Sequence, residues 1–459
     1  MLLLSIGTFA QSTTQKQKLS KKELRGALRP ERTCFDVTYY HLHLKIMPNK
    51  RTIEGYNDIH FKVVAPTQKI QIDLFKNMHI DTVLYQEKAL TFEREHNAVW
   101  VYFEEVLPTG ILQSIRVHYR GKPAVGLGTF GDRDFQWNKD KKGRPWVGVS
   151  CEHIGASLWY PNKDHLSDEP DSVRMNYLVP SELRYLANGK LEHKQVVSEQ
   201  LAEYQWFTRY PINNYNVTFY LGHHEKTIIP YKNTKGEQEV AFYSLDYDTK
   251  WVASYTAYLP IMIRYFERLF GQYPFWDDKL AIVQGGYRGR EHQTCLNIGK
   301  VLERNNWAYP IDVAWDATLA HELAHEWWGN AISVNDMADA WLHEGFATYC
   351  EALLIESIYG TEAYNKIISS FRRYSKQNTI VGKRDINYNS FRDSNIYFKG
   401  AVVIHELREE IADDRLFFAL LSGFQLRYKY QTVTTQDFIE TVNTVTGKDY
   451  TDFLKKRLY

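Results

Sequence analysis

The sequence predicts an α+β protein in which an antiparallel β domain comes first and a mostly helical domain follows. Runs that alternate apolar and polar residues are typical of strands with one buried face, and they recur from Cys34 to Tyr231. After the polar turn at 233–236, the apolar residues recur with a helical period. We therefore expect a signal-like and disordered lead-in over residues 1–25, a β domain over 26–232 and a helical domain over 233–459.

The strands are predicted from runs in which every second residue is apolar. In the first run, Tyr40, Leu42, Leu44 and Ile46 share one face, as expected of a strand with one buried side. Similar runs lie at 59–64, 70–74, 99–103, 115–119, 173–179 and 217–221. The stretch 126–145 is rich in Gly, Asp and Lys, and we expect it to form a surface loop.

The helices are predicted from apolar residues spaced three or four positions apart. Asp312 is the predicted cap of a helix that continues to Trp328 and ends at the Gly-Asn pair that follows. A second helix is predicted to start after Asp336 and to carry residues 341–349. Apolar residues at i, i+3, i+4, i+7 and i+11 predict a later helix over 400–411.

The composition is that of a folded protein without a strong net charge. Of the 459 residues, 44% are hydrophobic and 24% are charged, and 56 Lys and Arg against 55 Asp and Glu leave a formal charge of +1. The chain has no basic excess with which to bind nucleic acid, so we expect no nucleic-acid partner. The four cysteines form no C-x-x-C pair, which favours buried thiols over a disulfide framework or a cysteine zinc site.

The first ten residues form the one uninterrupted apolar run of the chain. A membrane helix needs about 20 such residues, so we expect no transmembrane segment. With the small residues Thr8 and Ala10 ahead of Gln11, the run is typical of the cleavage region of a secretory signal peptide. It predicts an exported protein, periplasmic or secreted. If the run is instead an early buried strand, the protein is expected in the cytoplasm.

The segment from His321 to His325 has the pattern H-E-x-x-H inside a helical stretch. A separation of four places both imidazoles on one helix face, where they can bind the same cation, and Glu322 lies beside that face within reach of a water on the metal. The alternative is a pair of histidines in a helix core, without a metal. This pattern predicts a metal site on the first helix of the second domain.

A third ligand is needed, because a catalytic zinc site uses three protein ligands and leaves a fourth position for water. Glu344 follows His325 by nineteen residues on the next predicted helix and is the expected ligand. The rival His343 would point about 100° away on that helix. Ligation by two histidines and one glutamate leaves the zinc unit with a positive charge, which brings bound water toward a pKa of about 7 and predicts hydrolytic chemistry.

Residues 321–330 (HELAHEWWGN) and 341–347 (WLHEGFA) resemble, at matching spacing, the signature of the zinc aminopeptidases related to aminopeptidase N, within the gluzincin peptidases. Weaker similarity extends over 270–275 and 159–170. The resemblance implies an N-terminal β-saddle domain followed by a thermolysin-like catalytic domain, as in bacterial two-domain members. The helical C-terminal domain of many relatives would then be absent or lie in sequence not given, and we expect an open cleft that accepts long peptides.

The resemblance also implies how a peptide amine is bound. The family motif G-x-M-E-N corresponds here to residues 288–292, in which Glu291 is kept and the other defined positions are replaced. Glu291 and Gly289, with Glu152 from the β domain, are the implied substrate-binding residues. In an extended strand the period of two would turn Arg288, Arg290 and His292 away from the face of Glu291. The alternatives are an arginine-rich surface strand with Glu291 in a salt bridge, and a surface carboxylate at position 152.

The implied catalytic residues are Glu322, which takes a proton from water, and Tyr397 of a Y-x-K-G motif, which stabilises the oxyanion. Without the resemblance, a tyrosine at this position is most simply read as a core residue. One Zn²⁺ per chain and peptide substrates follow from the same resemblance, and we expect removal of N-terminal residues from peptides.

Two other functions stay open on these residues. The first is a different zinc hydrolase on the same site, either an endopeptidase or a small-molecule hydrolase, since relatives include an epoxide-opening branch. The altered surroundings of Arg288 and Arg290 keep this alternative open. The second is a binding module that has the fold and no activity.

Overall fold

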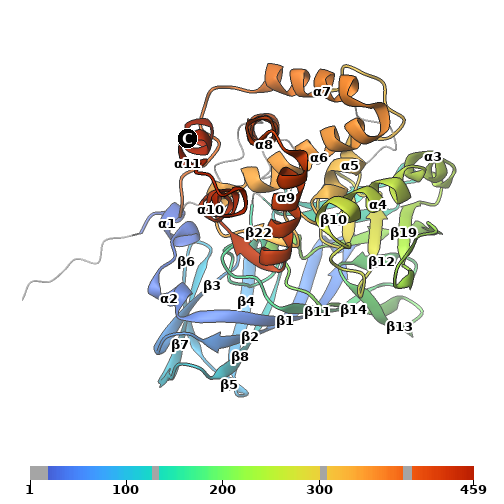
Figure 1. The fold of residues 1–459 in the computed structure, drawn as a ribbon. Coiled ribbons are helices and arrows are strands. Elements are labelled where there is room, and N and C mark those ends of the chain that lie inside the picture. The colour runs from blue at the N-terminus through green and yellow to red at the C-terminus, as the bar shows by residue number, and fades with distance from the viewer. Residues whose placement is uncertain (1–18, 127–133, 153, 300–307, 386–394) are drawn as a thin grey trace, which may run out of the picture.

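The computed structural model describes residues 19–126, 134–152, 154–299, 308–385 and 395–459, in which sheets form the lower part and helices the upper part (Figure 1). The signal peptide predicted at the N-terminus lies outside the described residues. The prediction of disorder is wrong for residues 21–25, which belong to a helix, Lys21–Gly26, capped by Ser20 and anchored by buried Leu24. Within them, no helix is both long enough and apolar enough to cross a membrane. The four cysteines are free and buried, as predicted.

The largest sheet has eight strands and comes from the first half of the chain. Their order is β13 (Lys190–Ser198), β14 (Leu201–Thr208), β11 (Ser172–Pro180), β1 (Phe35–Met47), β2 (Thr52–Val63), β8 (Leu112–Gly121), β4 (Met78–Tyr85) and β5 (Lys88–Ala89). A three-stranded sheet of β3 (Thr67–Asp73), β7 (Ala98–Leu107) and β6 (Thr91–Glu95) accompanies it. This half is the sheet-rich part that the alternating sequence predicts.

Strand β1 shows why the prediction succeeds. Tyr40, Leu42, Leu44 and Ile46 are all buried, and the residues between them are only partly covered. All neighbours in the eight-stranded sheet pair antiparallel except β1 and β11, which run parallel with Tyr39 opposite Ser172. A parallel pair needs a long crossover, and the intervening chain supplies it by forming other strands. The sheet is therefore antiparallel with one parallel pair.

A four-stranded sheet corrects the prediction of a surface loop over 126–145. The sheet runs in the order β12 (Arg184–Ala187), β15 (Phe219–Gly222), β10 (Pro145–Ser150) and β9 (Asp134–Lys139). Phe135 in β9 is buried in the core. The polar residues that suggested a loop belong to the turn after β9, where the Asp140 carboxylate accepts the N–H groups of Lys142 and Arg144 at 2.8 and 2.9 Å. The loop prediction is wrong over 134–139 and at 145, which lie in strands, and right for the turn at 140–144.

A second four-stranded sheet begins the other half of the molecule. Its order is β16 (His224–Ile228), β19 (Val240–Leu245), β20 (Leu280–Val283) and β21 (Cys295–Asn297). Strand β16 precedes the predicted domain boundary at 232/233 and pairs with β19, which follows it. The boundary itself stays a prediction. Two small pairs complete the strands: β17 (Lys232–Asn233) with β18 (Gly236–Glu237), and β22 (Ile332–Val334) with β23 (Gln431–Val433).

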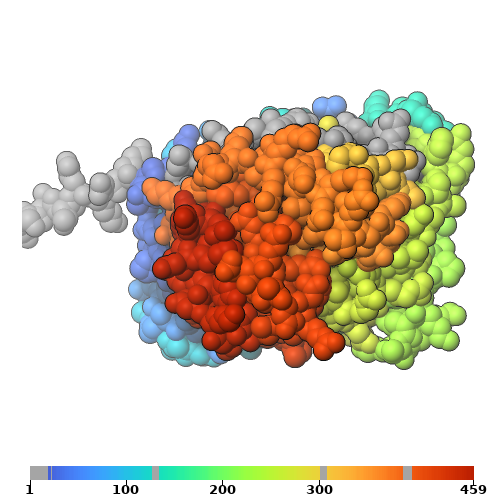
Figure 2. Space-filling view, turned by 45° about the horizontal axis from the view of Figure 1, so that its top comes forward, coloured from blue at the N-terminus to red at the C-terminus, as the bar shows by residue number. Residues whose placement is uncertain are grey.

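The helices gather mainly in the second half of the chain. They are α1 (Lys21–Gly26), α2 (Pro30–Thr33), α3 (Val252–Thr256), α4 (Leu259–Phe270), α5 (Ala317–Ala324), α6 (Trp341–Tyr359), α7 (Thr361–Tyr374), α8 (Asn395–Ile411), α9 (Asp414–Tyr428), α10 (Thr435–Thr446) and α11 (Thr451–Leu458). Figure 2 shows the C-terminal helices, in red and orange, on one face of the molecule. Buried apolar side chains of both halves form one continuous core.

The first helix of the metal motif is shorter than predicted. Its cap is Asp316, whose carboxylate accepts the N–H of Leu319 at 3.1 Å, and the helix ends at His325. The prediction that Asp312 caps this helix is wrong. Aspartates stand at positions 312 and 316, and the sequence does not show which of them faces the start of the helix. The helices predicted after Asp336 and over 400–411 are confirmed as α6 and α8.

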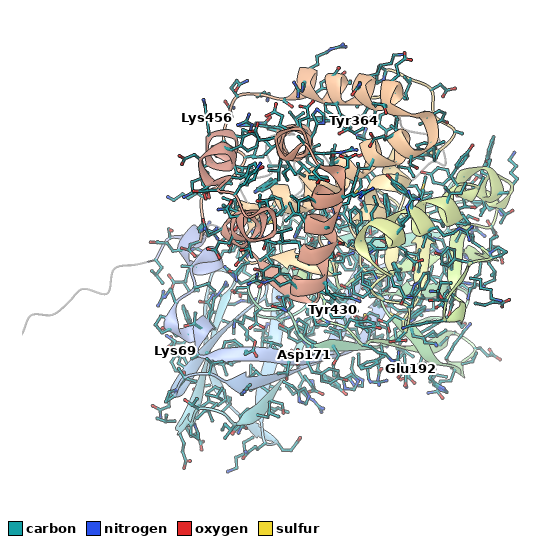
Figure 3. All side chains as sticks on the ribbon, viewed as in Figure 1. Lys69, Asp171, Glu192, Tyr364, Tyr430 and Lys456 are labelled. Carbon is teal, nitrogen blue, oxygen red and sulfur yellow. The ribbon has the colours of Figure 1, made fainter. Side chains whose placement is uncertain are left out.

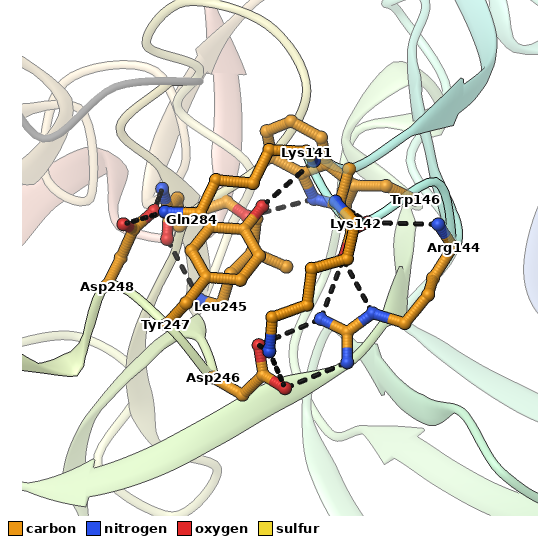
Figure 4. A network of polar contacts seen from close by, with 10 residues as sticks. Lys141, Lys142, Arg144, Trp146, Leu245, Asp246, Tyr247, Asp248 and Gln284 are labelled. Carbon is orange, nitrogen blue, oxygen red and sulfur yellow. Dashed lines mark hydrogen bonds and ion pairs between the residues drawn. The ribbon is translucent and has the colours of Figure 1, made fainter.

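Two polar or aromatic contacts join the sheets to the second half of the chain. Tyr430, labelled in Figure 3, stacks on Tyr210 at a centroid distance of 5.1 Å and donates to the carbonyl of Pro274 at 2.6 Å. At the other contact, Arg144 of the β9–β10 turn donates to both oxygens of Asp246, each at 2.8 Å, and also binds Asp140 (Figure 4). A bidentate pair of this kind fixes the turn against the end of β19.

We expect the substitution Asp246→Asn to lower the free energy of unfolding by at most about 1 kcal/mol, because both side chains of the pair are partly exposed to solvent. The hydrogen bond from Arg144 holds the pKa of Asp246 below its ordinary value. A lowered pKa stabilises the folded state above the unfolded-state pKa of about 4, so the difference from wild type should shrink as the pH falls below that value. Urea titrations at pH 7 and pH 3 measure it. The matched control is Asp312→Asn at an exposed site outside the network, and an equal loss in both variants would contradict the prediction.

Candidate active site

Helices α5 and α6 bring three possible metal ligands to one point. The Nε2 atoms of His321 and His325 lie 3.1 Å apart, and Glu344 Oε2 lies 3.1 Å from the first and 3.4 Å from the second. Zinc bonds of about 2.0 to 2.2 Å at tetrahedral angles imply ligand separations of about 3.3 to 3.6 Å. Among the described residues, this is the only group of three such side chains that could hold a metal ion. The spacing and donor set fit zinc.

The other nitrogen of each imidazole is fixed by a hydrogen bond. His325 Nδ1 lies 2.9 Å from the carbonyl oxygen of Trp328, and His321 Nδ1 lies 2.9 Å from Glu351 Oε1. A carbonyl can only accept, so Nδ1 of His325 carries a proton and donates it. This leaves the Nε2 lone pair of the neutral ring for a metal. The Tyr309 hydroxyl donates to the second oxygen of Glu351 at 2.6 Å.

Glu351 was not among the residues predicted from the sequence. It lies seven residues after Glu344, two turns along α6, so the two carboxylates are on the same side of the helix. That spacing is the signal that could have found it. Carboxylates that hold a metal-binding histidine are typical of zinc sites.

The electrostatics of the three residues indicate a site for positive charge. Burial favours neutral His325, but the hydrogen bond to Glu344 and the charge of that carboxylate outweigh burial and raise the pKa of His325 to about 9. Burial likewise favours neutral Glu344, yet its hydrogen bonds to His321 and His325 hold its pKa well below the ordinary value. Protonated imidazoles thus bring positive charge to Glu344. A metal cation bound at the same point would bring positive charge to the same carboxylate.

Glu322 is buried beside the cluster, only 6% exposed. Burial raises its pKa to about 7, although the charges of His321 and His325 oppose the rise. The backbone of Gly289 passes directly against it, because a Cβ atom at Gly289 would lie 2.1 Å from Glu322 Oε1. The predicted residues Gly289 and Glu322 are thus brought together, and only glycine leaves room for the carboxylate.

The segment 288–292 lies between β20 and β21 and folds back onto β21. Arg290 and Asn297 exchange two backbone hydrogen bonds of 3.0 and 2.9 Å, and a turn at Thr294, with φ of 60°, links the two sides. The segment is buried from residue 289 onward, so it is not the surface strand of the alternative interpretation. Arg290 donates to Ser150 Oγ at 2.7 Å.

Glu291 lies close enough to Glu152 and to the metal cluster for their charges to act on it. Both are buried, and burial followed by the charge of Glu152 raises the pKa of Glu291 to about 8. The charges of Glu322 and Glu344 act on Glu291 in the same direction. An interior with several carboxylates and few cations is stabilised by a bound ammonium group. The arrangement can therefore receive a positively charged amine next to the metal cluster.

Two residues that follow the metal motif hold this segment in place. Asn330 Nδ2 donates to the carbonyl oxygen of Glu291 at 2.7 Å, and Glu326 Oε1 accepts the N–H of Thr294 at 3.0 Å. Neither residue was given a role in the sequence prediction. Both lie in the same ten residues as His321 and His325, so the metal helix and the segment that carries Glu291 are joined directly.

Tyr397 lies over the cluster at the start of α8. Its ring stacks on the imidazole of His321 with 5.9 Å between the centroids and 22° between the planes. The backbones of α6 and α8 touch nearby, because a Cβ atom at Gly345 would lie 2.9 Å from the Cα of Gly400. The two glycines stand one residue after Glu344 and three residues after Tyr397, so the contact sets the height of the tyrosine above the metal ligands.

His343 is buried but does not join the three converging ligand atoms. Its Nε2 has no hydrogen-bond partner among the described residues. Burial and the charge of His325 lower its pKa to about 4. The geometry agrees with the prediction that Glu344, and not His343, faces the two motif histidines.

The fold and these converging side chains can now be set beside those of known proteins. In a comparison with known families, the model of the peptidase family M1 domain matches residues 311–456. Among curated relatives, aminopeptidase 2 from Candida albicans is 21% identical over 462 residues, which cover 94% of this chain and 48% of that protein. The chain thus spans about half the length of this relative.

Solved structures share the fold of the whole chain. An M1 zinc metallopeptidase mutant from Deinococcus radiodurans, bound to a Tyr-Ser-Ala substrate, superposes with a TM-score of 0.78 at 20% identity, covering 92% of this chain and 94% of that one. Leukotriene A4 hydrolase from Saccharomyces cerevisiae gives 0.74 at 16% identity, covering 93% of this chain and 66% of the other. At these identities the likeness concerns the fold.

We expect the substitution Glu351→Gln to weaken zinc binding about 10- to 100-fold, because the charged partner of His321 is lost while the ligands remain. Competition with a chromophoric chelator measures the affinity. The matched control is Glu356→Gln, five residues further along α6, whose carboxylate binds Arg408 at 2.7 Å outside the site. If both variants keep wild-type affinity, Glu351 has no part in metal binding.

Proposed function

We propose that this protein is a zinc-dependent aminopeptidase that hydrolyses the N-terminal peptide bond of peptides. The observation that carries the proposal is the convergence of His321, His325 and Glu344 on one point, with the buried carboxylates of Glu291 and Glu152 beside it. The M1 domain and the aminopeptidase relatives support the same function. Peptides are the proposed substrates, as in the related structure that holds one.

The three ligands would hold one zinc ion, which as a Lewis acid polarises a carbonyl and lowers the pKa of water. Glu322, buried next to His321, accepts a proton from the attacking water and passes it to the leaving amine. Tyr397 donates a hydrogen bond to the developing oxyanion, which stabilises the transition state by about 2 to 4 kcal/mol.

Glu291 and Glu152 would restrict the reaction to the N-terminus. The charge of Glu152 raises the pKa of buried Glu291, so Glu291 gains from a ligand with a positive charge, and the free α-ammonium group of a peptide carries one. An internal peptide bond presents no such group. The glutamates therefore favour exopeptidase over endopeptidase action, and Gly289 keeps the segment backbone close to Glu322.

The surroundings of Arg288 and Arg290 bear on the alternatives. Arg288 is exposed, whereas Arg290 is turned to Ser150 Oγ and the carbonyl of Gly289. Arg288 therefore does not cover Glu291 or Glu152, and this supports the aminopeptidase proposal. Export of the protein rests on the N-terminal residues alone and stays a prediction.

We expect Glu322→Gln to keep one zinc per chain and to lower kcat about 10²- to 10⁴-fold, because the amide cannot accept the proton. Hydrolysis of aminoacyl-anilides, together with metal analysis of the same samples, measures both quantities. Glu356→Gln serves as the control and should retain full activity. Near-normal turnover by Glu322→Gln would exclude the mechanism. Zinc far below one per chain in the wild type would support a binding module without activity.

We expect Glu291→Ala to lower kcat/KM for free peptides about 10- to 150-fold, since a charged hydrogen bond of about 1.5 to 3 kcal/mol is lost. The same variant should lose the preference for a free amine over an N-acetylated one. Parallel assays on a peptide and its acetylated form measure this preference. If the wild type cleaves both forms at one rate, the protein is an endopeptidase. If it cleaves neither while zinc is bound, a small-molecule hydrolase is the better assignment.

A further inference from the structure

The eight-stranded sheet carries two neighbouring histidines on its outer face. On β1, His41 and His43 alternate with the buried residues Leu42 and Leu44, so both imidazoles lie on the side of the sheet that faces away from the core. Both are partly covered, and the side chain of His41 is 23% exposed. Figure 1 shows β1 in the lower part of the molecule and α5 and α6 in the upper part. No candidate active-site residue belongs to a strand of this sheet.

One ring nitrogen of each histidine meets the other. His41 Nδ1 lies 3.3 Å from His43 Nε2, which is at the long end for a hydrogen bond. It equals the separation of about 3.3 to 3.6 Å expected of two ligands on one tetrahedral cation. The corresponding distance between His321 and His325 is 3.1 Å. A separation of two on a strand thus brings the imidazoles together as a separation of four does on a helix.

Both rings are in the form that binds a metal. Burial, followed by the charge of His43, lowers the pKa of His41 to about 4. Burial also lowers the pKa of His43. The two imidazoles are therefore neutral at pH 7, and each has one nitrogen with a free lone pair. Neutral imidazole is the form in which histidine binds a metal ion.

The charged neighbours of the pair are matched with one another. Asp58 lies opposite His41 on β2, with its Oδ2 4.0 Å from His41 Nδ1, and Arg116 holds this carboxylate by hydrogen bonds of 2.6 and 3.0 Å. Arg174, opposite His41 on β11, is paired with Glu192 at 2.7 Å. Because each arginine has its own carboxylate, little unbalanced positive charge is left to repel a cation. Asp58 is placed to accept a hydrogen bond from a water on the cation.

A stacked tyrosine restrains the second imidazole. Tyr56 lies opposite His43 on β2, and the two rings stack with 4.4 Å between the centroids and 23° between the planes. The guanidinium of Arg116 lies 4.2 Å from the centroid of Tyr56. These contacts limit rotation of the His43 ring, so its Nε2 stays directed to His41. A pair of ligands that is already ordered loses less conformational freedom when a metal binds.

We propose that His41 and His43 form a second metal site, for a divalent cation that prefers imidazole ligands, such as Cu²⁺, Ni²⁺ or Zn²⁺. Water completes the coordination, within reach of the Asp58 carboxylate. Cations that prefer oxygen ligands, such as Mg²⁺ and Ca²⁺, do not bind there. Two protein ligands hold the cation less tightly than the three of the candidate active site. The proposal does not depend on the peptidase activity proposed above.

Titration of the zinc-loaded protein with Cu²⁺, followed by electron paramagnetic resonance, tests the proposal. We expect one Cu²⁺ per chain to bind at micromolar concentration, with magnetic coupling to two imidazole nitrogens and no loss of zinc. Excess Mg²⁺ should not compete. His41→Gln and His43→Gln should each weaken binding about tenfold or more, since one of two ligands is lost. The matched control is His79→Gln, an exposed histidine on β4 that lies 3.5 Å from Asp81, which should bind Cu²⁺ as the wild type does.

Three results would overturn the proposal. The first is equal Cu²⁺ binding by the wild type and by the variant that lacks both histidines. The second is coupling to fewer than two nitrogens in the wild type, a measurement that needs no variant to fold. The third is release of one Zn²⁺ for each Cu²⁺ bound, with binding lost in His321→Ala and kept without His41 and His43, since this would place Cu²⁺ at the candidate active site. Circular dichroism and zinc content show whether each variant is folded.

Discussion

The arrangement of the site depends on an excess of buried negative charge between α5, α6 and the segment after β20. Glu152, Glu291, Glu322 and Glu344 are all buried there, and a buried carboxylate is costly unless a cation or hydrogen bonds offset it. The raised pKa values of Glu291 and Glu322 express this cost. Positive charge brought in by a ligand relieves it, so the interior favours binding of cations from outside the chain.

The metal ligands could be predicted from the sequence because their geometry is local. His321 and His325 share a helix face whatever the surrounding fold, and Glu344 needs only one more helix at a suitable distance. The same reasoning failed at Asp312, because capping depends on which aspartate reaches the free N–H groups. It also failed at 134–145, where a polar turn hid a hairpin with the buried ring of Phe135.

Contacts between distant segments lay beyond the sequence. Nothing in the sequence around Glu326 or Asn330 shows that they bind the backbone at Thr294 and Glu291, more than thirty residues earlier. Only the fold explains how Arg290 is accommodated in the altered motif. It places Ser150 of β10 next to the guanidinium of Arg290. Long-range partners of this kind determine whether an altered motif keeps its geometry.

The contact between Gly345 and Gly400 has a consequence for motion. With main chain against main chain and no side chain between, α6 and α8 have no rotamers to exchange and must move as one rigid body. Asn330 and Glu326 attach the segment of Glu291 to the same body. Ser150, two residues before Glu152 in the sheet-rich half, accepts a hydrogen bond from Arg290 of that segment and is tied to the same body. The metal ligands, the segment of Glu291 and the end of β10 that precedes Glu152 are therefore held in one arrangement.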